Sequence, residues 1–265
     1  MAVAKALNPV NWLKFFQETV VFGPSMWLRG ILPRNADGVV SINSRVGRIS
    51  LRPSDSDINV LRQVFVYKDY DFDKFTQCSR IYEAYQAMID AGRTPVIIDA
   101  GANIGAVSLW FARRFPKAKI VAIEPDPATV AVCRLNCAQY ENIRVVEGAI
   151  GGGNGMVTLE RPSHESWAVQ TKRESRGNIQ LFTVDALLEM AGIAADLLIV
   201  KIDIEGFESD LFASNTSWMP RAAVIVIELH DWLLPGRYTS VTFQKAIGLL
   251  HSEVLISGEN LVFIK

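Results

Sequence analysis

From residue 91 onward, short apolar runs alternate with stretches in which apolar residues recur at helical spacing. The apolar runs cover residues 96–99, 120–124, 143–147, 197–203 and 223–228. Strands that alternate with helices in this way form a parallel sheet with helices on its faces. The pattern therefore predicts a doubly wound α/β fold.

The first part of the chain has a different pattern. Residues 1–35 favour helices and loops, and residues 38–75 alternate short extended runs with polar turns. We predict an N-terminal helical and β cap over residues 1–90, not clearly an independent domain, followed by the main domain over residues 91–265. In the main domain, residues 151–182 predict a β insertion with a loop at 160–178, and residues 254–264 predict an antiparallel hairpin.

A turn with two glycines follows the first strand of the main domain. Residues 96–105 read Val-Ile-Ile-Asp-Ala-Gly-Ala-Asn-Ile-Gly, so that a buried strand ends at Asp99 and a helix begins near Ile104. Gly101 and Gly105 carry no Cβ, so the backbone can approach a ligand, and the helix start leaves amide donors free. The turn predicts a site for a nucleotide-like ligand.

The next strand ends in an acid, Glu124. It follows the glycine turn by about twenty residues, the spacing at which a carboxylate can accept hydrogen bonds from two ribose hydroxyls. The dinucleotide fingerprint Gly-x-Gly-x-x-Gly has its second glycine where Asn103 stands here. The pattern therefore favours a nucleoside without phosphates, such as S-adenosylmethionine.

Two later strand ends carry candidate catalytic residues. Asp203 and Glu205 follow one apolar run, and His230 follows the next. Asp203 could act as a base, steady the methionine part of the cofactor or help to bind a cation. Glu205 could share these roles or could cap the following helix. His230 is the preferred base because an unperturbed imidazole has a pKa of about 6.5; a structural role is its alternative.

The third strand ends at Glu147, where the adenine edge would be read. The Glu147 carboxylate would accept from the adenine amino group, and the backbone of the turn that leads to Ala149 would donate to a ring nitrogen. Asp126, in contrast, is expected to set the turn or the helix start that follows the second strand.

Composition limits the possible partners and the location of the protein. The chain has 265 residues, 49% of them hydrophobic, and a net charge of −1, which gives no general attraction to nucleic acid. Three cysteines without metal-ligand spacing, and no secretory signal, predict a cytoplasmic protein. Residues 10–32 are apolar but interrupted by charges. We predict that they form a docking helix, with a membrane surface or a dimer contact as the alternative.

Three motifs in order resemble the FkbM family of S-adenosylmethionine-dependent methyltransferases. They are Ile98-Asp-Ala-Gly-Ala-Asn-Ile-Gly105, Ile123-Glu-Pro-Asp-Pro127 and Lys201-Ile-Asp-Ile-Glu-Gly-Phe-Glu208, within a likeness that covers about residues 94–230. The resemblance implies the class I methyltransferase fold, a Rossmann-like and mostly parallel seven-stranded sheet with one antiparallel strand near its edge. It also implies O-methylation of a hydroxyl on a sugar, a glycan component or a secondary metabolite.

The motifs and strand ends together define the candidate site. The cofactor candidates are Asp99, Gly101, Ala102, Asn103, Gly105, Glu124, Glu147, Ala149 and Asp203, and the catalytic candidates are His230, Asp203 and Glu205. The resemblance fixes neither a base nor a metal, and the sequence does not show the divalent cation that some related folds use. Two alternatives stay open: a nicotinamide-dependent oxidoreductase on a similar fold, and a non-catalytic cofactor-binding homologue.

Overall fold

The computed structural model describes residues 9–53, 55–160, 170–174 and 176–265. The chain divides into two compact units between Lys68 and Asp69. The sequence pattern put the boundary of the cap at residue 90. In the structure, helix α4 (Cys78–Asp90) packs against strands β3 (Thr94–Ala100) and β10 (Ala195–Ile202), so it belongs to the second unit.

The first unit contains helices and one hairpin. Its elements are α2 (Pro9–Phe22), η1 (Pro24–Gly30), β1 (Val40–Ser44), β2 (Gly47–Leu51), α3 (Asp57–Leu61) and η2 (Arg62–Val66). β1 and β2 pair antiparallel, which confirms two of the extended runs predicted within residues 38–75. The extended prediction is wrong for residues 57–66, because Leu61, Val64 and Phe65 are buried at helical spacing there.

The apolar segment 10–32 forms α2 and η1. Within this unit, Phe16 and Ile31 are exposed, whereas Glu18 is buried and accepts a hydrogen bond from Arg62 at 2.6 Å. A membrane-surface or dimer contact of this segment stays a prediction. Among the described residues, no helix is both long and apolar enough to cross a membrane.

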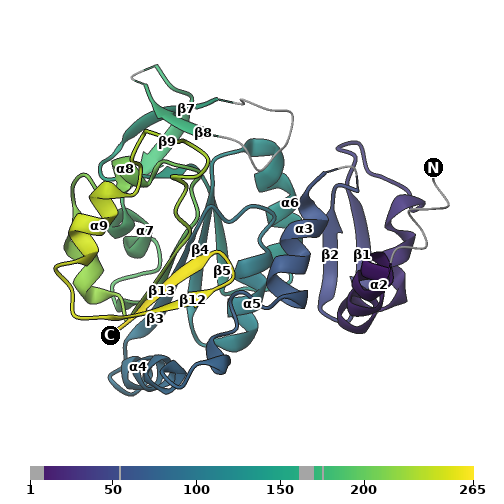
Figure 1. Cartoon of the computed structure of the whole chain (residues 1–265), viewed down its shortest axis with the longest axis horizontal. Coiled ribbons are helices and arrows are strands. Elements are labelled where there is room, and N and C mark those ends of the chain that lie inside the picture. Colours follow the sequence, from purple (N-terminus) through teal and green to yellow (C-terminus); the bar gives the residue numbers. More distant parts are fainter. Residues whose placement is uncertain (1–8, 54, 161–169, 175) are drawn as a thin grey trace. The chain divides into compact units, whose positions relative to one another are not determined.

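The second unit is built on a seven-stranded sheet (Figure 1). Its other strands are β4 (Lys119–Glu124), β5 (Ile143–Glu147), β11 (Val224–Ile227), β12 (Glu253–Ser257) and β13 (Asn260–Ile264). The strand order is β12-β13-β11-β10-β3-β4-β5, and β13 is antiparallel to both of its neighbours. The doubly wound, mostly parallel sheet with one antiparallel strand near its edge is therefore confirmed.

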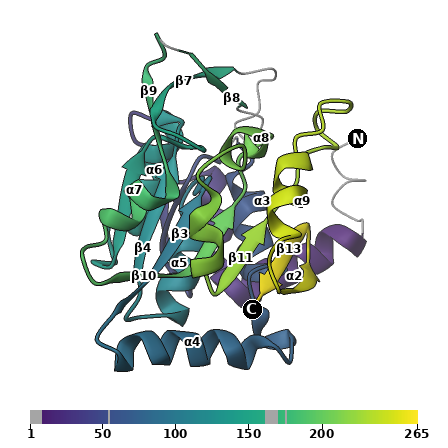
Figure 2. The same ribbon diagram turned by 90° about the vertical axis from the view of Figure 1, so that its left-hand side faces the viewer.

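Helices cover both faces of this sheet (Figure 2). On one face, Ile98, Val121 and Val200 pack in a single core with helices α7 (Val184–Glu189) and α9 (Val241–Ile247). The other face is covered by α5 (Ala106–Arg114) and α6 (Pro127–Cys137), where Ala122 of β4 packs on Cys133 and Cys137. The central strands β3, β4, β10 and β11 are buried on both faces, which explains why they read as continuous apolar runs.

A second, smaller sheet follows β5. It consists of β6 (Ala149–Ile150), β7 (Gly155–Glu160), β8 (Gln170–Arg173) and β9 (Ile179–Phe182), in the order β6-β9-β7-β8. This arrangement confirms the predicted β insertion. Of the loop predicted at 160–178, residues 161–169 and 175 lie outside the described residues.

Candidate active site

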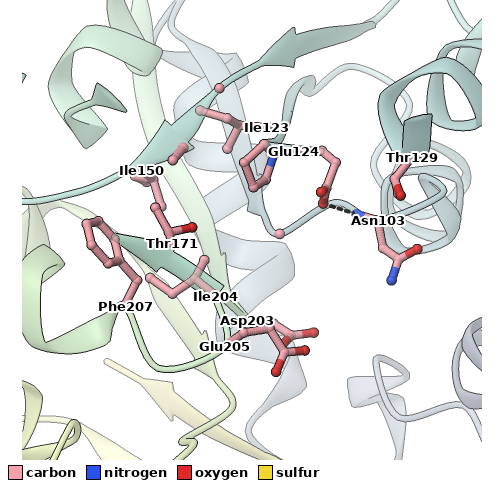
Figure 3. Close-up of a pocket in the computed structure, with 14 residues that line it drawn as sticks. Asn103, Ile123, Glu124, Thr129, Ile150, Thr171, Asp203, Ile204, Glu205 and Phe207 are labelled. Atoms are coloured by element: carbon pink, nitrogen blue, oxygen red, sulfur yellow. Dashed lines mark hydrogen bonds between the residues drawn. The ribbon is translucent and has the colours of Figure 1, made fainter. Parts of the chain in front are cut away.

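A cleft of about 610 Å³, partly open to solvent, lies at the carboxyl ends of β3, β4 and β10. It is lined by Gly101, Asn103, Ile123, Glu124, Pro125, Thr129, Gly148, Ala149, Ile150, Thr171, Asp203, Ile204, Glu205 and Phe207. Figure 3 shows the carboxylates of Asp203 and Glu205 pointing in the same direction. They lie at some distance from the hydrogen-bonded pair Glu124 and Asn103.

The turn after β3 must be built from glycine at two positions. Gly101 has a φ of +72°, and a Cβ there would lie 1.7 Å from the backbone oxygen of Asp203. Gly105 precedes α5 with a φ of +84°, and a Cβ there would lie 2.9 Å from Cys137 Sγ. The first glycine therefore lets the end of β3 lie against the end of β10, and the second lets α5 begin against α6.

Glu124 is a buried carboxylate at the wall of the cleft. Its Oε2 accepts a hydrogen bond from the backbone N–H of Asn103 at 3.0 Å, and its Oε1 accepts one from Asp126 at 3.0 Å. Burial raises the pKa of Glu124 to about 7, although these two backbone hydrogen bonds oppose the shift. Each oxygen keeps a further lone pair that a ligand hydroxyl can use.

A buried lysine joins the ends of β3 and β10. Lys201 Nζ donates to the backbone oxygen of Gly101 at 2.7 Å and lies 3.4 Å from Asp99 Oδ1 and 3.5 Å from Asp203 Oδ2. Burial by itself lowers the pKa of Lys201, but the charges of Asp203 and Asp99 outweigh it and raise the pKa. Lys201 therefore stays charged and fixes the turn that carries Gly101.

His230 lies behind the cleft among four carboxyl groups. Its Nδ1 is 2.7 Å from Glu208 Oε1, which is hydrogen-bond distance. Its Nε2 faces three carboxylates at longer distances: Asp203 Oδ1 at 3.5 Å, Glu205 Oε2 at 3.7 Å and Glu228 Oε1 at 3.7 Å. The side chain of His230 is 1% exposed, so this arrangement is almost fully shielded from solvent.

The crowding of acids changes how these groups titrate. Burial, and next the charge of Asp203, raise the pKa of Glu205 to about 8 and that of Glu228 to about 7. Burial lowers the pKa of His230, but Glu208 and the other carboxylates outweigh it and raise the pKa to about 9. At neutral pH the imidazole is therefore mainly protonated, a form that cannot accept a proton from a substrate.

The residues predicted from the sequence fall into three groups in the structure. Gly101, Asn103, Glu124, Ala149, Asp203 and Glu205 line the cleft. Asp99, Ala102 and His230 are buried and are not among its lining residues, and neither is Gly105. Glu147 also lies outside the lining; its half-exposed side chain pairs with Arg134 at 3.3 Å. Asp126 accepts from Thr129 at the start of α6, in keeping with its predicted place in the turn.

Several cleft and cluster residues were not assigned a role from the sequence. Thr129, Thr171 and Phe207 line the cleft from α6, β8 and the turn before helix α8 (Glu208–Leu211). Glu208 and Glu228 complete the shell around His230. The position of Glu228 at a strand end was a usable signal, whereas nothing in the local pattern shows that Glu208 turns inward.

The strand order, with β13 antiparallel beside β11, and a cleft at the strand ends define a Rossmann-like class I methyltransferase fold. A family profile described as "Methyltransferase FkbM domain" matches residues 99–252, which is more than half of the chain. The chain belongs to this methyltransferase family. Membership overturns the alternative of a nicotinamide-dependent oxidoreductase.

Several known proteins resemble the chain over part of their length. The 2-O-methyltransferase NoeI of Sinorhizobium fredii is 26% identical over 156 residues, 52% of this chain and 64% of NoeI. Methyltransferase sdnD of Sordaria araneosa is 52% identical over 44 residues, 17% of each chain. The crystal structure of Methyltransferase FkbM from Methylobacillus flagellatus KT aligns with a TM-score of 0.45 at 13% identity, over 65% of this chain and 44% of that one. The chain thus covers less than two thirds of the length of each curated relative that it matches.

Proposed function

We propose that the protein transfers a methyl group from S-adenosylmethionine to a hydroxyl of a sugar, a glycan component or a secondary metabolite. The observation that carries the proposal is Glu124, a buried acid at the wall of the cleft whose two oxygens are held by backbone N–H groups. This geometry suits two adjacent ribose hydroxyls. Membership in the methyltransferase family supports the same donor.

The opposite side of the cleft suits the methionine part of the donor and the reaction itself. Asp203 and Glu205 line it, and the negative charge of Asp203, joined by that of Glu205 when Glu205 is ionised, favours the positive sulfonium. The acceptor oxygen attacks the methyl carbon in line with the sulfur. The carbon–sulfur bond breaks and its electron pair stays on sulfur, which leaves neutral S-adenosylhomocysteine. Positioning of the two reactants supplies most of the rate.

We propose that Glu205, in preference to His230, takes the proton of the acceptor hydroxyl. It does so as the carboxylate, the form that predominates above its pKa of about 8, so the rate of transfer should rise with pH through that value. Glu205 lines the cleft, and its side chain is 23% exposed, so a bound acceptor can reach it. It also has a left-handed backbone with a φ of 52°, a strained conformation that is concentrated at functional sites. His230 is buried behind the cleft and held by Glu208. We therefore give His230 a positioning role.

The acceptor is proposed to be uncharged near the reacting hydroxyl. A carboxylate or phosphate there would be repelled by Asp203, and also by Glu205 and Glu228 when they are ionised. Trp232 is 63% exposed, and its ring centre lies 6.3 Å from that of His230. An exposed aromatic ring next to the histidine that the acids surround suits the apolar face of a sugar, whose hydroxyls the acids can bind. The 2-O-methyltransferase relative supports a hydroxyl acceptor.

The donor site is tested by Glu124→Gln. We expect the affinity for S-adenosylhomocysteine to fall about 10- to 100-fold, because the ribose hydroxyls lose a charged acceptor. Isothermal titration measures this, and Glu147→Gln is the matched control because that acid lies outside the cleft lining. Equal affinity in the wild type and Glu124→Gln would refute the donor site. Tight binding without transfer to any acceptor would favour the non-catalytic alternative.

The acceptor side is tested by Trp232→Ala with radiolabelled methyl donor and a panel of methyl glycosides that carry a free 2-hydroxyl. We expect KM for an accepted glycoside to rise about three- to tenfold, because stacking is lost, with donor affinity unchanged. Ile193→Ala, another exposed apolar side chain, is the control. An unchanged KM would exclude Trp232 as the sugar platform, and transfer to 2-deoxy glycosides at the same rate would exclude the 2-hydroxyl.

A further inference from the structure

We propose that Asp203, Glu228 and His230 bind one divalent metal cation at the edge of the cleft. One ligand atom from each residue can be chosen so that all three lie within 4.8 Å of one another. Two ligand atoms that share an ion at 2.0–2.6 Å each are separated by at most about 5 Å. The three side chains can therefore reach the same ion.

The orientation of His230 provides independent evidence. Its imidazole is 1% exposed, and Glu208 occupies Nδ1 at 2.7 Å. Nε2 is thus aimed at Asp203 and Glu228, at 3.5 and 3.7 Å, and no hydrogen bond joins it to either of them among the described contacts. A carboxylate on one ring nitrogen of a metal-binding histidine, with the other nitrogen facing the ion, is the usual second-shell arrangement.

The charge of the cluster also favours a cation. Four carboxyl groups surround the imidazole. The nearby ammonium group, that of Lys201, is directed at backbone oxygens and at the far oxygen of Asp203. A cation at Nε2 would take the place of the proton that the imidazolium carries there. Carboxylates suit Mn²⁺ and Mg²⁺, and an imidazole adds affinity for first-row metals, so Mn²⁺ is the appropriate probe.

The position of the site suggests what the ion would do. Asp203 lines the cleft, and its side chain is 25% exposed, so the ion is reachable from the cavity. An ion there can bind the acceptor hydroxyl and lower its pKa, while Glu205, outside the ligand triad, remains available for the proton. This role rests on the proposed function, whereas binding of the ion does not.

The experiment is a titration of the full, untagged chain with Mn²⁺, followed by the electron paramagnetic resonance signal of free Mn²⁺. We expect one bound ion per chain. Asp203→Asn and Glu228→Gln should each weaken binding about tenfold or more, and Glu208→Gln should do so through the orientation of His230. Glu141→Gln, an exposed acid outside the cluster, should bind as the wild type does. Circular dichroism checks that each variant is folded.

Two results would overturn the metal site. One is a signal of free Mn²⁺ whose amplitude is the same with and without the wild-type protein at millimolar concentrations of Mn²⁺, whether or not S-adenosylhomocysteine is present. The other is binding that persists unchanged in folded Asp203→Asn and Glu228→Gln. Parallel titration of Glu228→Gln with S-adenosylhomocysteine separates the two hypotheses, because Glu228 lies outside the cleft lining: loss of the metal site through this residue leaves donor binding intact, whereas failure of the donor site leaves Mn²⁺ binding intact.

Discussion

Lys201→Met should lower the free energy of unfolding by about 3–5 kcal/mol, the loss expected when one partner of a buried ion pair is removed. Lys201 is 1% exposed, and Asp99 beside it is fully buried. Ser108 donates to Asp99 Oδ2 at 2.6 Å, but Oδ1 has no hydrogen bond and lies 3.4 Å from the ammonium. Methionine keeps the length of the side chain and leaves that carboxylate without a counter-charge.

Chemical denaturation with urea measures this loss. Lys172→Met is the matched control: Lys172 pairs with Glu160 at 3.0 Å, but both side chains are more than half exposed, so the change should cost less than about 1 kcal/mol. If the unpaired charge is the cause, adding Asp99→Asn to Lys201→Met should recover part of the stability. A double variant as unstable as the sum of the single variants would point to lost packing instead.

The features that could be predicted from sequence are those that depend on local pattern. The central strands β3, β4 and β10 are buried on both faces, so each appears as an apolar run, and Asp99, Glu124 and Asp203 lie at or just after their carboxyl ends. The turn at Gly101 could be predicted because its close approach to Asp203 requires glycine. The helices at 57–66 were missed within the stretch predicted to alternate extended runs and turns, although the buried Leu61, Val64 and Phe65 have helical spacing.

The roles of the acids could not be predicted, because they depend on contacts between distant parts of the chain. His230 appeared to be a base when judged by its ordinary pKa, but Glu208, Asp203 and Glu205 outweigh the effect of burial and raise that pKa to about 9. Glu147 ends a strand just as Glu124 does, yet its side chain pairs with Arg134 outside the cleft lining. Position at a strand end therefore selects candidates, and side-chain direction decides among them.

Glu205→Gln should reduce kcat about 10²- to 10⁴-fold, the range expected when a general base is removed. The glutamine has nearly the same shape but cannot take the acceptor proton. Glu205 lines the cleft with a 23% exposed side chain, whereas Glu228 is 10% exposed and is not among the lining residues. The acceptor hydroxyl can therefore reach Glu205 directly. Affinity for S-adenosylhomocysteine, whose sulfur is uncharged, should not change, because Glu124 lies at a different wall.

Initial rates with radiolabelled donor and an accepted methyl glycoside measure this effect, and titration with S-adenosylhomocysteine checks the donor site. A base leaves a further signature: formate, a small carboxylate, should restore part of the activity of Glu205→Ala but none of that of Glu124→Ala. Glu141→Gln is the exposed control. If Glu205→Gln keeps the wild-type kcat while Asp203→Asn loses it, the proton goes to Asp203, and the left-handed conformation of Glu205 serves only to shape the turn after β10.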